Sequence, residues 1–121
     1  MNKYRNTSQD IHSRIYRFIL GCFKDVVRKI PKTTENISII SQVSSSLTSI
    51  GANDQEVDAS ASKKDFIEKY DIVKKETKET HYWLSFIKDA ELVSKNIVEP
   101  YINECKGILF IVSKIILNTK R

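Results

Sequence analysis

Apolar residues recur at helical spacing in four segments of the chain. The first segment carries a stripe at steps of four and three: Ile11, Ile15, Phe18, Cys22 and Val26. This spacing places the side chains on one face of an amphipathic helix. We expect that helix to run from about residue 9 to residue 30, because Pro31 disfavours the helical conformation in the residue before it.

The second segment has apolar residues at steps of three, four and three: Ile40, Val43, Leu47 and Ile50. Thr33 or Thr34 is the expected N-cap, and the helix should end near Val57. Serine, threonine and glycine interrupt this segment between residues 44 and 51. Small residues of poor helix propensity on a helix face indicate that another helix approaches closely.

The third segment begins with the strongest start signal of the chain. Ser62 is followed three residues later by Asp65, as in a capping box, where the Ser side chain bonds an early N–H and the acid reaches back. The residues that follow repeat at alternating steps of four and three: Phe66, Tyr70, Val73, Thr77, Thr80, Leu84 and Ile87. This heptad pattern predicts packing in a left-handed helix bundle.

The fourth segment opens at Ser94 and is apolar nearly all round in its last three turns, where Phe110, Ile111 and Leu117 widen the apolar stripe. A surface helix of a monomer does not need two apolar faces. We therefore expect this helix either to be the central one or to bury its second face against another subunit. Pro100 should start or kink the helix.

Four helices of this length with short connections predict an all-α, antiparallel up-down-up-down four-helix bundle that forms a single domain over residues 1–121. In that arrangement the first helix lies between the second and the fourth.

Composition argues against a catalyst. The chain has 121 residues but only three Gly, two Cys and two His. Three Gly are too few for a dinucleotide fingerprint or a phosphate loop, and the Cys and His are too dispersed for a zinc site. No segment is apolar enough to span a bilayer. We expect no catalytic, cofactor-binding or metal-binding residues, no membrane contact, and a cytoplasmic location.

The net charge of +5 is unevenly distributed. Residues 1–32 carry eight basic and two acidic side chains, residues 33–58 carry four acidic and no Lys or Arg side chains, and residues 93–121 carry five basic and two acidic ones. The basic residues could track a nucleic-acid backbone, form a solvated face, or meet the acidic second helix of another subunit. The candidates for nucleic-acid contact are Arg14, Arg17, Lys24, Arg28, Lys29, Lys120 and Arg121.

Other candidate groups have simpler interpretations. Glu76 and Glu79 share a helix face beside Trp83, and we favour a structural role in which they accept hydrogen bonds or pair with a basic residue of a neighbouring helix. His81 with Tyr82 and Trp83 fits a core or interface cluster better than a ligand-binding patch. His12 has no identifiable partner. Cys22 and Cys105 lie in apolar stripes, where a free Cys behaves as a small hydrophobe.

An ordered set of short motifs resembles a known family. The motifs are Ser41-Gln42-Val43, Ser49-Ile50-Gly51-Ala52-Asn53 with Glu56, Ser62-Lys63-Lys64-Asp65-Phe66, and Glu76, Glu79-Thr80 and Tyr82-Trp83-Leu84. In this order and spacing they resemble the bacterial four-helix-bundle proteins encoded in intervening sequences of 23S ribosomal RNA genes, from about Ile11 to Lys120. The chain departs from the family at Ser44-Ser45 and Ser60-Ala61, where basic residues are usual, and at Val57, where Gly is usual.

The resemblance implies an antiparallel bundle that assembles as a ring-like homopentamer. It also implies a relationship to the accessory proteins of diversity-generating retroelements, which are basic pentamers that bind a reverse transcriptase and nucleic acid. We therefore expect a non-enzymatic homo-oligomer that contacts RNA or DNA through its basic surface. The alternative is a protein-interaction module in which charge serves only subunit pairing.

Overall fold

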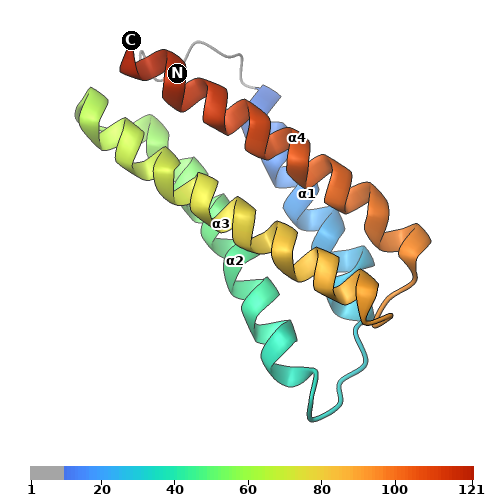
Figure 1. The fold of residues 1–121 in the computed structure, drawn as a ribbon. Helices are drawn as coiled ribbons and strands as arrows, with labels where there is room; N and C mark the ends of the chain where they lie inside the picture. Colours follow the sequence, from blue (N-terminus) through green and yellow to red (C-terminus); the bar gives the residue numbers. More distant parts are fainter. Residues whose placement is uncertain (1–9) are drawn as a thin grey trace.

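Four long α-helices account for most of the chain (Figure 1). The computed structural model describes residues 10–121. Its helices are α1 (Asp10–Asp25), α2 (Ile37–Glu56), α3 (Lys63–Asp89) and α4 (Lys95–Lys120), with short 3₁₀ turns η1 (Val27–Lys29) and η2 (Val57–Ala59) after the first two. No strand occurs in this part of the chain, which confirms the predicted all-α fold.

The helices occupy the corners of a square in chain order. α1 packs against α2 and α4, and α3 packs against the same two helices, while no Cα atoms of a diagonal pair lie within 8 Å of each other. We call the outer surface where two neighbouring helices meet an edge of the bundle. The α1–α2 edge therefore lies on the opposite side of the bundle from the α3–α4 edge. This order confirms that the first helix lies between the second and the fourth.

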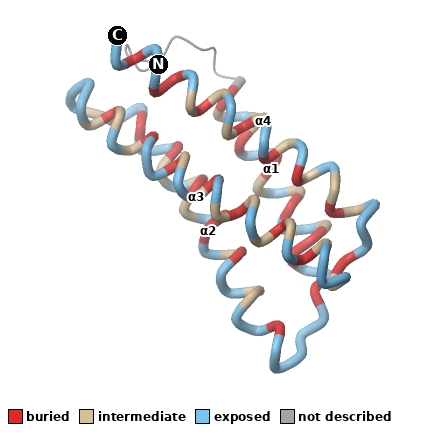
Figure 2. Tube along the Cα trace, in the orientation of Figure 1, coloured by how far each residue is buried: buried red, intermediate tan, exposed pale blue. Residues whose placement is uncertain are grey.

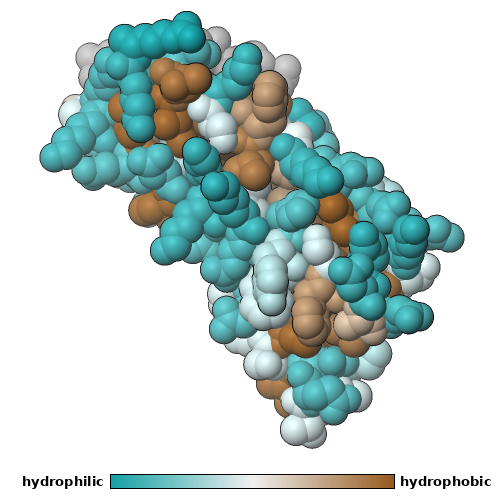
Figure 3. Space-filling view, viewed as in Figure 1, coloured by the Kyte–Doolittle hydropathy of each residue, from teal (hydrophilic) through white to brown (hydrophobic). Residues whose placement is uncertain are grey.

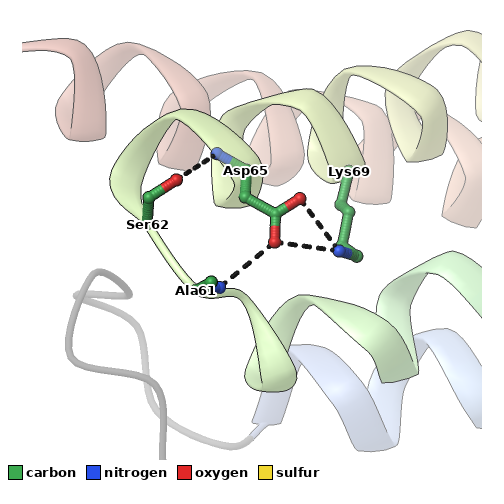
Figure 4. Close-up of polar contacts among 4 residues, drawn as sticks. All are labelled: Ala61, Ser62, Asp65 and Lys69. Atoms are coloured by element: carbon green, nitrogen blue, oxygen red, sulfur yellow. Dashed lines mark hydrogen bonds and ion pairs between the residues drawn. The ribbon is translucent and has the colours of Figure 1, made fainter.

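Ser62 caps α3 as the sequence predicts (Figure 4). Its hydroxyl oxygen accepts a hydrogen bond from the Asp65 N–H at 3.1 Å. The Asp65 carboxylate reaches back one residue further than a standard capping box, to the Ala61 N–H at 3.1 Å, and it also pairs with Lys69 at 3.0 Å. Hydrogen bonding to Lys69, and then to Ala61, lowers the pKa of Asp65.

The apolar stripes form the core. All seven residues of the heptad pattern in α3 are buried, as are the four apolar residues Ile11, Ile15, Phe18 and Cys22 of α1 and Val26 directly after it. Buried positions recur along the inward side of each helix in Figure 2. The Thr77 hydroxyl donates to the Val73 carbonyl at 2.7 Å. The Thr80 hydroxyl lies 2.9 Å from the Glu76 carbonyl oxygen and 2.8 Å from the Ser46 hydroxyl of α2, and its single proton serves one of the two. A small serine at that position allows α2 and α3 to approach closely, as the sequence indicated.

Two predicted helix ends are wrong. α1 ends at Asp25, because the chain tightens into η1 before Ile30 becomes extended ahead of Pro31. α2 begins at Ile37, since residues 33–36 form a turn instead of a cap, and Asn36 occupies the N-cap position. The Asn36 side chain donates to the Pro31 carbonyl at 2.9 Å, which holds this connection together.

The fourth helix lies at a corner of the bundle, so the expectation of a central helix is wrong. It packs only on α1 and α3 and leaves Phe110 and Leu117 exposed at 63% and 57%. Pro100 lies inside α4, five residues after its first residue, so it does not start the helix. The other expectation, that a second subunit covers the outer apolar face, stays a prediction.

Candidate functional site

Arg14 of α1 is paired with Glu104 of α4. Arg14 Nε donates to Glu104 Oε2 at 2.7 Å, and Nη2 donates to Oε1 at 2.9 Å. The guanidinium lies against Gly107, where a Cβ atom would collide with Nη2. Hydrogen bonding to Glu104 raises the pKa of Arg14. This candidate for phosphate contact therefore has its charge compensated within the bundle.

A second contact joins α1 to α4 further along. The Tyr101 hydroxyl donates a hydrogen bond to the Asp25 carboxylate and lies over Gly21, where an added Cβ would be 2.7 Å from the hydroxyl oxygen. Burial, together with the hydrogen bond to Asp25, raises the pKa of Tyr101 to about 12. Glycines at positions 21 and 107 thus allow side chains of the facing helix to lie flat on the backbone.

The remaining candidate basic residues form two groups. Arg17, Lys24, Arg28 and Lys29 are exposed along α1 and η1, a row that we call the α1 basic row. Lys120 and Arg121 are exposed at the end of α4, where the Arg121 carbonyl accepts from Lys63 Nζ at 3.4 Å. This end of α4 lies beside the start of α3 and extends beyond the first turn of α1 (Figure 1), whereas η1 lies at the far end of α1, about 24 Å from its start. The C-terminal pair therefore stands apart from the α1 basic row.

His12 has partners that sequence reasoning did not find. Its Nδ1 lies 2.6 Å from Asp54 Oδ2, and its Nε2 lies 3.0 Å from Asp58 Oδ2. Asp54 is buried and also accepts a hydrogen bond from the Tyr70 hydroxyl at 3.2 Å. These contacts join α1, α2, η2 and α3, so His12 holds the first helix against the acidic second one.

A cavity of about 310 Å³ lies between α1 and α2 beside His12. Its lining is mainly apolar and includes the exposed side of Tyr16 and the backbone of Gly51. A Cβ at position 51 would be 3.0 Å from Ile19 Cδ1, so glycine allows Ile19 to pack across the α2 backbone. Two of the small residues that the sequence marked on α2, Thr48 and Gly51, line this cavity.

Exposed apolar side chains of α1 and α4 lie on two opposite edges of the bundle, and α3 carries a third set, Ile72, Tyr82 and Phe86. On α1, Tyr16, Leu20 and Phe23 follow at steps of four and three, and we call them the α1 stripe. Tyr16 lines the cavity with α2 residues, which places the α1 stripe on the α1–α2 edge.

On α4, Phe110 and Leu117 form the α4 stripe, with Lys114 Nζ 5.4 Å from the Phe110 ring centroid. Phe110 follows Lys106 by four residues, so the α4 stripe and Lys106 share one face of α4. The charge of Lys106 lowers the pKa of His81 of α3, which places this face on the α3–α4 edge. In the view of Figure 3, hydrophobic surface appears as separate brown patches among hydrophilic side chains.

The residues singled out on α3 lie on two different flanks of the helix. His81 faces α4, and burial together with Lys106 and Lys88 lowers its pKa. Glu76, Glu79 and Trp83 lie on the other flank, toward α2. Neither glutamate is within ion-pair distance of a basic side chain of the described residues, so the expected pairing with a neighbouring helix is not found.

Both cysteines are free and buried, as expected for small hydrophobic residues. Burial raises the pKa of the Cys22 thiol to about 12, with smaller contributions from Cys105 and Asp25. Burial and then Glu104 raise the pKa of Cys105 to about 12. Cys105 Sγ also donates to the Thr77 carbonyl of α3 at 3.3 Å. Such thiols carry almost no thiolate at neutral pH.

Within residues 10–121, no three histidine, cysteine or carboxylate side chains gather closely enough to hold a metal ion. The helices of this region also contain none that is both long and apolar enough to cross a membrane.

Comparison with known proteins identifies the family. A family model described as 23S rRNA-intervening sequence protein matches residues 7–114. The chain belongs to the 23S rRNA-intervening sequence protein family. This confirms the resemblance seen in the ordered motifs. No match was found among curated proteins.

A solved structure agrees with this membership. It comes from Bacteroides thetaiotaomicron VPI-5482 and is described as a protein with unknown function from the S23 ribosomal protein family. It is 27% identical to this chain, covers 88% of this chain and 97% of its own, and superposes with a TM-score of 0.79. The intervening-sequence family thus supplies the fold, and the function must be argued from the surfaces described above.

Proposed function

We propose that this intervening-sequence protein is a non-enzymatic scaffold that self-associates into a homo-oligomer and contacts RNA or DNA through its α1 basic row. By resemblance to the family, the homo-oligomer is a pentamer. The observation that carries the proposal is the presence of exposed apolar stripes on two opposite edges of the bundle.

Opposite edges suit a head-to-tail assembly. An interface between two different surfaces repeats from subunit to subunit and closes into a ring when the rotation permits. The α1 stripe borders a cavity and the small residues of α2, while the α4 stripe offers Phe110 and Leu117 as projecting side chains. Insertion of the α4 stripe of one subunit against the α1–α2 edge of the next would cover both surfaces.

The remaining surface of α1 supports nucleic-acid contact. Arg17, Lys24, Arg28 and Lys29 are exposed, and none is within ion-pair distance of a carboxylate of the described residues. Unpaired basic side chains along a helix neutralise phosphates and release counterions from the nucleic acid. Arg14 contributes less, because Glu104 already compensates its charge.

Light scattering coupled to size exclusion tests self-association. We expect a mass several times the 14.0 kDa of one chain, and about 70 kDa for the pentamer. Leu20→Glu and Leu117→Glu should each lower the mass, because a charge in an apolar interface costs several kcal/mol. Ile72→Glu is the matched control, since Ile72 is an exposed apolar residue of α3 and belongs to neither stripe. A 14.0 kDa wild-type species at micromolar concentration contradicts the proposal.

Fluorescence anisotropy with mixed-sequence RNA and duplex DNA at about 50 mM salt tests nucleic-acid contact. We expect binding that weakens steeply with added salt. The double reversal Arg17→Glu and Lys24→Glu should abolish it, whereas the equal charge change Lys64→Glu and Lys75→Glu on α3 should weaken it much less. Absence of binding to either probe refutes this part.

Subunit pairing by charge is the second candidate for the basic row. It is favoured by the exposed acidic residues Glu35 and Glu56 at the two ends of α2. Under this alternative, the Arg17→Glu and Lys24→Glu variant loses mass in light scattering and the wild type binds no nucleic acid. Under the leading proposal, the variant keeps its mass and loses nucleic-acid binding.

A further inference from the structure

The α2-facing flank of α3 carries aromatic and acidic side chains that the proposed function does not use. Their order along the helix follows steps of four and three, with Tyr82 adjoining. We call them the acidic–aromatic strip: Ile72, Glu76, Glu79, Tyr82, Trp83 and Phe86. The strip lies on the α2–α3 edge, away from the edges that hold the α1 and α4 stripes.

The aromatic part of the strip is ordered and accessible. Trp83 packs its inner side against the core and meets Tyr82 at 4.9 Å and Phe86 at 6.1 Å between ring centroids, both edge to face. Tyr82 and Phe86 are exposed, and Ile72 is exposed one helical turn before Glu76. The rings thus form a fixed apolar platform with open faces.

The acidic part of the strip is uncompensated. Glu76 is half-buried, and burial followed by the charge of Glu79 raises its pKa. Lys75 opposes this effect only partly and is not within ion-pair distance of either glutamate. Two carboxylates one turn apart lie beside aromatic rings, and no basic side chain of residues 10–121 is within ion-pair distance of them. This arrangement favours a cationic group brought by another molecule.

We propose that the acidic–aromatic strip binds an arginine-bearing segment of another protein. A guanidinium stacks on aromatic faces and pairs with carboxylates through its planar N–H groups, so one arginine satisfies both parts of the strip. Neighbouring apolar side chains of the segment would cover Ile72 and Phe86. A nucleic acid is disfavoured, because its phosphates would face Glu76 and Glu79.

The test uses Trp83, which is the only tryptophan of the chain. We expect an acetylated hexapeptide that alternates arginine and leucine to change Trp83 emission saturably, and its fluorescein-labelled form to gain anisotropy with the same midpoint. The lysine–leucine peptide should bind about threefold more weakly, because ammonium does not stack as a guanidinium does. No response in either readout, or equal binding of the two peptides, overturns the proposal.

A pair of matched variants locates the site. Glu79→Gln should weaken the arginine peptide about fivefold, as expected for one partly exposed ion pair. Glu99→Gln removes the same charge from α4, where Glu99 lies 3.8 Å from Lys88 and away from the strip, and it should leave the affinity unchanged. Equal loss in both variants shows non-specific charge attraction and overturns the assignment.

The outcome is independent of the proposed function. If Glu79→Gln lowers the oligomer mass in the absence of peptide, the strip is a subunit contact and the assignment to another protein is wrong. If the mass and nucleic-acid binding are as proposed but the peptide does not bind, only this inference fails. If the peptide binds to a monomer without nucleic-acid affinity, the inference stands and the proposed function fails.

Discussion

Gly107 and Arg14 offer a test in which the effect of one substitution depends on the other residue. Alanine in place of a glycine inside a helix stabilises a protein by about 1 kcal/mol. At position 107, however, the new Cβ would displace the Arg14 guanidinium from its place beside Glu104. The gain in helix propensity is then offset by a weakened ion pair.

The magnitude follows from the geometry of the pair. Two charge-assisted hydrogen bonds at 2.7 and 2.9 Å would contribute more if they were buried, but both side chains are about one-third exposed. Solvent screening reduces the contribution of the pair to about 1 kcal/mol. Gly107→Ala should therefore be nearly neutral in the wild type and should stabilise the Arg14→Ala variant by about 1 kcal/mol.

Urea unfolding followed by circular dichroism measures all four members of this double-mutant cycle. The four proteins must be compared at one concentration, because self-association adds to apparent stability. A coupling energy of about 1 kcal/mol exceeds the usual deviation from additivity of independent sites. Equal stabilisation by Gly107→Ala in both backgrounds would show that Arg14 does not lie over Gly107.

Three further predictions concern single sites. Ser62→Ala should lower the free energy of unfolding by about 1 kcal/mol, as measured by thermal unfolding, because the Ser62 side chain caps α3. Ser94→Ala should change it little, because the Ser94 side chain makes no such bond to α4, and equal losses would refute this. The thiols of Cys22 and Cys105 should resist iodoacetamide at pH 8 until urea unfolds the protein, because their pKa values are about 12. Mass spectrometry measures the labelling, and rapid labelling of the folded protein would contradict their burial. The lowered pKa of His81 means that the folded state favours the neutral imidazole. The stability that the neutral imidazole contributes is complete above the ordinary pKa of about 6.5, and it is lost as pH falls through the lowered pKa. Proton NMR should show His81 titrating below that ordinary value and moving upward in Lys106→Ala, and an unmoved midpoint would exclude the charge of Lys106 as a cause.

Local patterns in the sequence were enough to predict the bundle. The heptad stripe of α3 is buried because each of its positions faces α2 or α4, and spacing alone determines such a face. The Ser62 cap is equally local. The end of α1 differs from the prediction because the chain enters the 3₁₀ turn η1 at Val27, and apolar spacing does not distinguish such a turn from an α-helix.

Contacts between distant residues were beyond the sequence. Glu104 is 90 positions from Arg14, and Asp54 is 42 from His12, so no spacing rule connects them. Both contacts change the candidate site, since they remove Arg14 and His12 from the side chains available to a ligand. The exposure of Phe110 and Leu117 likewise depended on the position of α4 at a corner of the bundle.

The central claim is that the two apolar edges of the bundle are complementary halves of one subunit interface. Light scattering on an equimolar mixture of the Leu20→Glu and Leu117→Glu variants tests it most directly. Each variant retains one intact edge, so the mixture should form a heterodimer of about 28 kDa, twice the mass of one chain, while each variant alone stays at 14.0 kDa. A mixture that stays at 14.0 kDa would contradict the claim.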